Sequence, residues 1–245
     1  MRVAFDLDGV LADLHTPFVR AVQELFPQID LGAVGAADIG ASPPDDGDER
    51  PIEGVPPLQG QARSVPLTRR QSDAVWRALA SRHDFWEGLD EIEDGAIARL
   101  AELADARGWE VLFITSRPRS AGRTVQRQSQ RWLAARGFPL PSVYVVHGSR
   151  GKVADALAID VVVDDRPDNC LDVVLESRAA ALLVWRGSPA TVPASAKRLG
   201  IAVVPTVASV FEALVETDRR DGDGSFLQRL RHLFGLRTRS PRTGA

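Results

Sequence analysis

The fold of this chain is constrained most by short apolar runs that recur along it and alternate with helical stretches. The runs read VAF at 3–5, EVLFI at 110–114, VYVV at 143–146, DVVVDD at 160–165 and AALLVW at 180–185. Their apolar character is continuous, as is typical of strands that are covered on both faces of a sheet. Two stretches with an apolar stripe at helical spacing, Ala96–Arg107 and Ser120–Arg136, each stop before a glycine. This order predicts an α/β fold with a doubly wound parallel sheet.

The interval between the first predicted strand and the second is too long for one crossover. It spans about a hundred residues, whereas a whole strand–helix–strand unit needs about 30. It holds helix candidates at Thr16–Leu25 and Arg69–Arg82, and a capping box of Thr68 and Gln71 opens the second. The stretch between them is rich in proline, glycine and acidic residues and predicts a loop. We therefore expect residues 14–90 to form a small, mainly helical cap inserted after the first strand.

The rest of the chain divides into a core and a tail. Residues 1–13 and 91–217 are expected to form the core around the sheet. Residues 218–245 begin with a charged linker, continue into a short amphipathic stretch and end in a segment with the composition of a disordered tail. The amphipathic stretch predicts a helix that docks on the body or on a partner subunit, so a homodimer is one expected assembly.

Composition limits the classes of protein to which this chain can belong. With 245 residues, of which 44% are hydrophobic, it can bury one substantial core and a smaller second unit. The single cysteine, Cys170, excludes an internal disulfide framework, fits a reducing compartment and is expected to be a buried small hydrophobe. A net charge of −3 favours neither nucleic acid nor an acidic membrane as the main partner. The first strand leaves no room for a signal peptide and no run is long enough to span a membrane, so we expect a soluble, cytoplasmic protein.

Two carboxylates and a glycine follow the first apolar run. Asp6 and Asp8 project to the same side where the chain leaves the sheet, because side chains alternate along a strand. An Asp-x-Asp-Gly sequence is also typical of an ordinary turn at the end of a strand. Two like charges held this close repel each other and need a cation or a proton between them. The stretch therefore raises the hypothesis of a metal site.

Later strands also end in polar residues, at the edge of the sheet where α/β proteins bind ligands. Thr115 and Ser116 follow one strand, and Asp164 and Asp165 end another. Lys152 lies between them in the sequence, at the start of a predicted helix, where an anion would bind. Up to four carboxylates, a pair of hydroxyls and one ammonium would then gather at this edge. Such a set requires a hard divalent cation with oxygen ligands, most simply Mg²⁺.

Four stretches of the chain carry a resemblance to a known family. DLDGVLAD, ITSRP, a lysine and VVVDDRPDN, in that order and spacing, resemble the four motifs of the haloacid dehalogenase (HAD) superfamily of phosphotransferases. Within that superfamily, DGVLAD, DDRPDN and FWEGLDEIEDGA are similar to the 5′(3′)-deoxyribonucleotidases, the cytosolic type C 5′-nucleotidases. The resemblance covers residues 1 to about 185. It implies a HAD-like Rossmannoid core and a Mg²⁺-dependent phosphomonoester hydrolase, in particular a 5′-nucleotidase that acts on (deoxy)nucleoside monophosphates.

The resemblance also implies a role for each motif residue. Asp6 would be the nucleophile that takes the phosphoryl group as an aspartyl phosphate. Asp8 would protonate the leaving oxygen and then activate water, with its backbone carbonyl facing the metal. Lys152 would offset the negative charge on Asp6 and on the transferring group. The implied metal ligands are Asp6, Asp8, Asp164 and Asp165, with Asp164 bound directly and Asp165 behind it or bound through water.

Substrate recognition is expected to involve the phosphate and the rest of the substrate separately. The residues implied to bind the phosphate are Gly9, Thr115, Ser116 and Lys152. Phe85 and Trp86 match the aromatic pair that surrounds the nucleobase in the resembled family, although they could equally be core residues of the hinge. Leu14 stands where that family tends to place a phenylalanine, which speaks against base stacking. Arg117 is an addition to its motif, and it either binds a second anionic group of the substrate or faces solvent.

Three other interpretations stay open. Within the enzyme class, the alternative is a phosphatase of a small phosphorylated metabolite or sugar. A non-catalytic HAD-like binding or regulatory module is disfavoured because no motif residue is missing. A phospho-accepting receiver domain also combines an acceptor aspartate with a threonine and a lysine, but its acceptor normally ends a later strand and no cap is inserted. We therefore expect the partner to be a small-molecule phosphomonoester, most simply a nucleotide.

Overall fold

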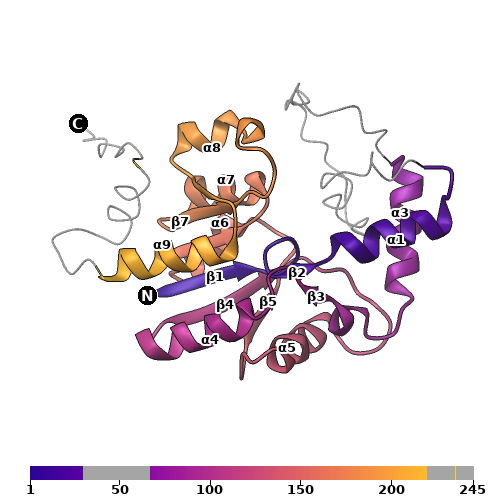
Figure 1. The fold of residues 1–245 in the computed structure, drawn as a ribbon, viewed down its shortest axis with the longest axis horizontal. Helices are drawn as coiled ribbons and strands as arrows, with labels where there is room; N and C mark the ends of the chain where they lie inside the picture. The colour runs from indigo at the N-terminus through magenta and orange to yellow at the C-terminus, as the bar shows by residue number, and fades with distance from the viewer. Residues whose placement is uncertain (30–66, 220–234, 236–245) are drawn as a thin grey trace.

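The computed structural model describes residues 1–29, 67–219 and 235 (Figure 1). Within them the strands are β1 (Arg2–Asp6), β2 (Ala12–Asp13), β3 (Asp90–Glu91), β4 (Glu110–Thr115), β5 (Ser142–Val145), β6 (Val161–Asp164), β7 (Ala180–Val184) and β8 (Ala202–Val204). The α-helices are α1 (His15–Leu25), α3 (Arg69–Ala80), α4 (Ala96–Arg107), α5 (Val125–Ala135), α6 (Arg150–Ala156), α7 (Pro167–Glu176), α8 (Ala194–Leu199) and α9 (Val207–Arg219). Short 3-10 helices are η2 (Phe85–Gly88) and η3 (Pro189–Thr191).

The main sheet has the strand order β5-β4-β1-β6-β7-β8, and every neighbouring pair in it is parallel. Helices cover both of its faces (Figure 1). On one face, apolar residues of α4, α5 and α9 pack against strand side chains such as Phe5 and Phe113. On the other face, residues of α6, α7 and α8 pack against strand side chains such as Ala4 and Val162. The predicted α/β fold with a doubly wound parallel sheet is therefore confirmed.

β1 lies in the middle of the sheet, with β4 on one side and β6 on the other. Asp6 pairs in register with Ile114 of β4, and Phe5 pairs with Val163 of β6. Parallel pairing thereby brings the carboxyl ends of three neighbouring strands to one edge of the sheet. In open α/β sheets this is the edge at which ligands bind.

The inserted segment leaves and rejoins the core at one place, because β2 and β3 pair with each other as a short antiparallel ladder. Between them in sequence, α1 and α3 pack together, with the rings of Phe18 and Trp76 5.4 Å apart. The predicted capping box of Thr68 and Gln71 opens α3. Figure 1 shows these two helices beyond the carboxyl end of β1. No helix among the residues that the structure describes is long and apolar enough to cross a membrane.

Several elements differ from their sequence predictions. The helix predicted over Ser120–Arg136 begins only at Val125, because the backbone of Ala121 forms hydrogen bonds with Ala80 and Asp84 instead of continuing a helix. β8, β2 and β3 were not predicted, since runs of two or three residues carry no periodic signal. The five predicted strands and the bounds of α4 are confirmed. The predicted cap loop within 30–66, the tail helix and the tail lie outside the described residues.

Candidate active site

Three aspartates, two of them buried and one half-buried, form a cluster at the carboxyl ends of β1 and β6. Asp6 ends β1, Asp164 ends β6 and Asp165 follows it. One carboxylate oxygen of each lies within 4.8 Å of the corresponding oxygens of the other two. Asp6 is 7% exposed and Asp164 is fully buried. We call Asp6, Asp164 and Asp165 the carboxylate cluster.

Burial raises the pKa values of all three carboxyl groups and is the largest cause in each case, and neighbouring carboxylates raise the pKa values of Asp6 and Asp165 further. The pKa of Asp6 lies well above its usual range because of this burial and then because of the charge on Asp164. The pKa of Asp165 is raised to about 7 by burial and then by the charge on Asp164. Carboxylates in this position require protons or a further positive charge beside them.

Gly9 lies in the loop that follows β1, directly against the side chain of Asp165, where a residue with a Cβ would clash. Its φ is 84°, in the left-handed region that favours glycine, and an added Cβ would lie 2.0 Å from Asp165 Oδ2. The backbone N–H groups of Leu11 and Ala12 both donate to the carbonyl oxygen of Leu7, which closes this loop into a tight turn. Any larger residue at position 9 would therefore displace a member of the cluster.

Arg150 supplies the positive charge that the structure places against the carboxylate cluster. Its Nη2 donates to Asp6 Oδ1 at 3.1 Å, and its Nε lies 3.8 Å from Asp164 Oδ2. Its side chain is only 4% exposed, so this charge acts at low local dielectric. Lys152, the cation named from the sequence, is instead exposed on α6. The structure thus brings Arg150 into the site and leaves Lys152 outside it.

Helix phase explains why the two basic residues separate. Ser149 caps α6 and accepts hydrogen bonds from the backbone N–H groups of Gly151 and Lys152. Residues two apart on an α-helix point about 200° away from each other. Arg150 lies one turn before Ala154, and both are buried. The four-residue spacing of Arg150 and Ala154 is the sequence signal that places Arg150 on the same side of the helix as an apolar residue.

Asp164 is held in place by groups that follow it in the chain. The side-chain amide of Asn169 donates to its Oδ1 at 3.1 Å and to its Oδ2 at 2.9 Å. The backbone N–H of Arg166 donates to Oδ1 at 2.8 Å. Asn169 was not identified from the sequence, although it lies in the same motif as the two aspartates.

Cys170, one residue further along α7, is buried, as predicted, and burial raises the pKa of its thiol well above the usual value.

The donor set of the carboxylate cluster fits a hard divalent cation. Carboxylate oxygens are the ligands that Mg²⁺ prefers in proteins. Asp165 Oδ1 is buried and has no hydrogen-bond partner among the described residues, so the chain itself leaves one acceptor in the cluster unsatisfied. The charge of Arg150, and that of Arg166 on Asp164 and Asp165, do not neutralise three carboxylates. Asp6, Asp164 and Asp165 could therefore hold Mg²⁺.

The carboxylate of Asp8 lies apart from this cluster. Nε of Arg117 donates to its Oδ1 at 3.0 Å and to its Oδ2 at 2.8 Å, and Nη2 of Arg117 donates to Oδ1 at 2.8 Å. Thr115, at the end of β4, has its hydroxyl 3.5 Å from Asp8 Oδ2 and is 1% exposed. Ser116, which follows it, is half-buried. Of the two predicted hydroxyl residues, Thr115 thus contacts Asp8.

Arg117 is one of the most buried charged residues that the structure describes, with a side-chain exposure of 0%. This position corrects both interpretations made from the sequence, because the guanidinium neither faces solvent nor is open to a second anionic group of a substrate. Its partner is inside the protein, and that partner is Asp8. The ion pair gives Arg117 a place in the site that its motif did not predict.

Phe85 and Trp86 are core residues of η2, where the inserted segment returns to the core. They are 8% and 1% exposed, and their rings pack edge to face with centroids 4.8 Å apart. The indole N–H of Trp86 donates to the carbonyl oxygen of Pro118 at 3.1 Å. Rings buried in this way offer no free face to a nucleobase. Of the two interpretations made from the sequence, the structure supports the hinge core.

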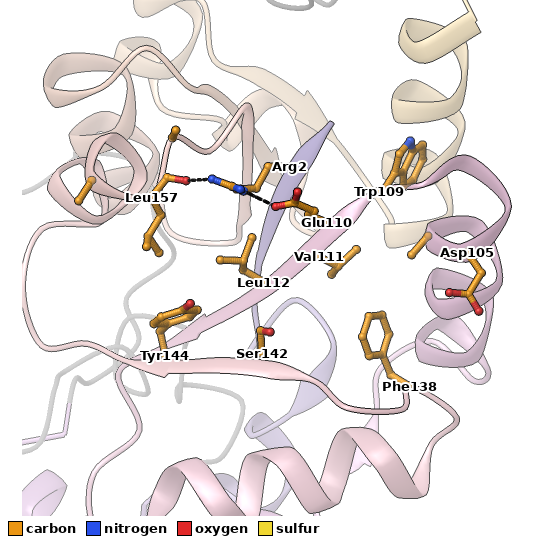
Figure 2. A pocket seen from close by; sticks show the side chains of 13 residues that line it. Arg2, Asp105, Trp109, Glu110, Val111, Leu112, Phe138, Ser142, Tyr144 and Leu157 are labelled. Carbon is orange, nitrogen blue, oxygen red and sulfur yellow. Dashed lines mark hydrogen bonds and ion pairs between the residues drawn. The ribbon is translucent and has the colours of Figure 1, made fainter.

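A separate pocket of about 600 Å³ lies at the opposite end of the sheet, near the amino ends of β1 and β4 (Figure 2). Arg2 and Glu110 on its wall form an ion pair, and Arg2 also donates to the carbonyl oxygen of Leu157. None of the residues predicted for the site lines this pocket. It contributes nothing to the chemistry at the carboxyl ends of the strands.

Comparison with known proteins bears on the fold. No protein-family model and no curated protein matches the chain. Among solved structures, a HAD family hydrolase from Deinococcus radiodurans R1 with bound phosphate and sodium is 21% identical, with a TM-score of 0.52 over 88% of this chain and 95% of that one. A hydrolase from Pseudomonas syringae is 13% identical, with a TM-score of 0.50 over 88% of this chain and 99% of that one. The chain shares its fold with these two hydrolases, the first of which is a HAD family hydrolase.

Proposed function

We propose that this protein is a Mg²⁺-dependent phosphomonoester hydrolase that works through an aspartyl phosphate on Asp6. The observation that carries the proposal is the meeting of Asp6, Asp164 and Asp165 with the buried Arg150 at the carboxyl ends of the central strands. The order of the sequence motifs supports it. So does the fold shared with a HAD family hydrolase whose structure holds bound phosphate.

The proposed reaction has two steps that use different carboxylates. In the first, an oxygen of Asp6 forms a bond to phosphorus, the bond to the ester oxygen breaks, and Asp8 gives a proton to that oxygen. In the second, Asp8 takes a proton from water, the water oxygen bonds to phosphorus and Asp6 is released with free phosphate. Splitting the displacement in this way replaces one difficult step with two easier ones.

The neighbouring groups have electrostatic roles in this scheme. Arg150 lies where its charge can offset the negative charge that Asp6 and the phosphoryl group share. Thr115 and Ser116 offer hydroxyl donors to the phosphoryl oxygens. Asp6, Asp164 and Asp165 would hold Mg²⁺, which when bound neutralises the cluster and the incoming dianion.

The substrate class proposed is a small phosphomonoester. The resemblance to 5′(3′)-deoxyribonucleotidases predicts a (deoxy)nucleoside monophosphate, but the buried rings of Phe85 and Trp86 give base stacking no support. A small phosphorylated metabolite or sugar therefore stands beside the nucleotide as the alternative substrate.

Turnover of a generic aryl phosphate by the purified protein tests the proposal. We expect release of phosphate in the presence of Mg²⁺ and its loss after treatment with EDTA. Activity that survives exhaustive EDTA treatment would remove the metal from the scheme, and absence of turnover with every ester tried would favour a non-catalytic binding module. A panel of nucleoside monophosphates and sugar phosphates then decides the substrate class.

A further inference from the structure

We propose that Arg117 is a positioning residue that fixes the carboxylate of Asp8, the group that the proposed function uses as general acid and base. This inference rests on that proposed function. Arg117 would hold the Asp8 carboxylate in place and would not itself contact the substrate. Ser129, Trp86 and Trp132 surround the guanidinium of Arg117, and we call these four residues the Asp8 clamp.

The hydrogen bonds of Arg117 fix the orientation of the Asp8 carboxylate. Nε contacts both carboxylate oxygens and Nη2 contacts one, at 2.8–3.0 Å, so two nitrogens of the planar guanidinium meet the two oxygens. Such fork-to-fork pairing restricts the carboxylate in plane and in rotation, which a single donor cannot do. Nη1 is held separately by the Ser129 hydroxyl at 2.9 Å.

The guanidinium is itself fixed by packing. Its central carbon lies 4.8 Å from the ring centroid of Trp86 and 5.6 Å from that of Trp132. Each indole N–H is tied to a backbone carbonyl, that of Pro118 for Trp86 and that of Leu89 for Trp132. The clamp therefore joins η2, α5 and the loop after β4 into one support for Asp8.

Asp8 needs such a support because of its place in the chain. It lies beyond the last residue of β1, and the side-chain hydrogen bonds that its carboxylate accepts come from Arg117 and Thr115. Proton transfer requires hydrogen-bond reach to the leaving oxygen. A misplacement of about 1 Å can cost about a hundredfold in rate.

Leaving-group dependence distinguishes positioning of Asp8 from a general structural role. We expect Arg117→Met to slow leaving-group release from an alkyl phosphate such as glycerol phosphate by about a hundredfold in a single turnover, as for a misplaced catalytic group. Release from p-nitrophenyl phosphate, whose leaving group needs no proton, should slow by less than about threefold. Loss of a merely structural residue would lower both rates by the same factor.

A double-mutant cycle and a matched control complete the test. In an Asp8→Asn background, adding Arg117→Met should change the alkyl phosphate rate by less than about twofold, because the group that it positions is already gone. Arg136 also packs on Trp132, at 4.5 Å, but has no contact with Asp8. We expect Arg136→Met to leave the ratio of the two rates unchanged.

Three outcomes would overturn the inference: equal losses on both esters, multiplicative losses in the double mutant, or a changed ratio in Arg136→Met. If Arg117→Met does not fold, Arg117→Lys carries the test, because lysine keeps the charge but cannot form the fork. It should then show a smaller loss confined to the alkyl ester, and equal losses would again contradict the clamp. A wild-type protein that turns over neither ester refutes the proposed function and the inference with it, whereas an active wild type with non-selective variants refutes only the inference.

Discussion

Asp6 in the carboxylate cluster and Asp8 beside its clamp are two residues apart in the chain, and their negative charges are balanced in different ways. Asp6 faces two further carboxylates and one arginine, and its pKa is raised. Asp165 Oδ1, also in the cluster, is buried and has no hydrogen-bond partner in the part of the chain that the structure describes. Asp8 has both oxygens bound by Arg117, which is itself fully paired and packed. The cluster can therefore accept a further cation, whereas the charge of Asp8 is already paired by a described residue of the chain.

Strand geometry causes this division. Asp6 is the last residue of β1 and so lies at the sheet edge beside the end of β6. Asp8 already belongs to the tight turn that follows, where its carboxylate meets the loop after β4. Two residues that are close in the sequence thus lie in different parts of the proposed site: Asp6 in the carboxylate cluster, and Asp8 where protons would be transferred.

The largest effect should come from removing the nucleophile. We expect Asp6→Asn to lower phosphate release by about 10⁴-fold or more, because an amide oxygen is too poor a nucleophile to displace the leaving group. The measurement is steady-state phosphate release at saturating Mg²⁺, with folding checked by circular dichroism. Substantial activity in a folded Asp6→Asn protein would place the nucleophile elsewhere.

Arg150 and Lys152 provide the next test, since they differ in exposure but share a helix. Arg150→Met should lower kcat by about 10²–10³-fold, the range typical of a lost electrostatic stabiliser. Lys152→Met, the matched control on the exposed side of α6, should change kcat by less than about twofold. Equal losses in the two variants, or a larger loss for Lys152→Met, would restore the assignment made from the motif.

Asp164 and its exposed neighbour Asp168 provide a matched variant and control for metal binding. Asp164→Asn should raise the Mg²⁺ concentration for half-maximal activity by about tenfold or more, since it removes a charged oxygen of the cluster. Asp168 is exposed in the first turn of α7 and lies outside the carboxylate cluster, so Asp168→Asn should have less than about a twofold effect. Titrations of activity with Mg²⁺ compare the two, and similar shifts would mean that the ligand set is wrong.

The smallest effect concerns stability without metal. The pKa of Asp165 is about 7 in the folded chain, above its ordinary unfolded value, so the folded state binds the extra proton. Its contribution to stability is then present below about pH 4 and is lost as the pH rises to about 7. In EDTA we expect the unfolding midpoint to fall by a few degrees over this window, and Asp165→Asn to flatten that fall. Calorimetry at several pH values checks it, and a fall that is the same in Asp165→Asn would assign it to other groups.

The strands and helices of the core could be predicted from the sequence because apolar runs and helix-ending glycines are visible within short segments. Five apolar runs correspond to β1, β4, β5, β6 and β7, and α4 ends at Arg107, just before Gly108, whose φ is 62°. The start of α5 could not be predicted, since the loop before it forms backbone hydrogen bonds to Ala80 and Asp84, which are far away in sequence. Tertiary contacts override local propensity at such positions.

The site residues that lie at the ends of strands could be predicted from the sequence. Asp6 and Asp164 end the strands that the apolar runs predicted, so their meeting followed from the parallel order. The identity of the buried cation depended on helix phase, which the motif spacing did not report. The partner of Arg117 depended on the path of the loop after β4 and on two tryptophans distant in sequence, for which a single sequence carries no signal.

The central claim is that Asp6 carries the phosphoryl group and Asp8 transfers the protons, and trapping the intermediate tests it most directly. Asp8→Asn should lower turnover by about 10²–10⁴-fold, yet with p-nitrophenyl phosphate and Mg²⁺ the first step should partly survive. The acid-quenched variant is then expected to show, by mass spectrometry, one hydroxylamine-labile phosphoryl group on the peptide that contains Asp6. A phosphoryl group on Thr115 or Ser116, or none on the Asp6 peptide while the first step proceeds, would contradict the account.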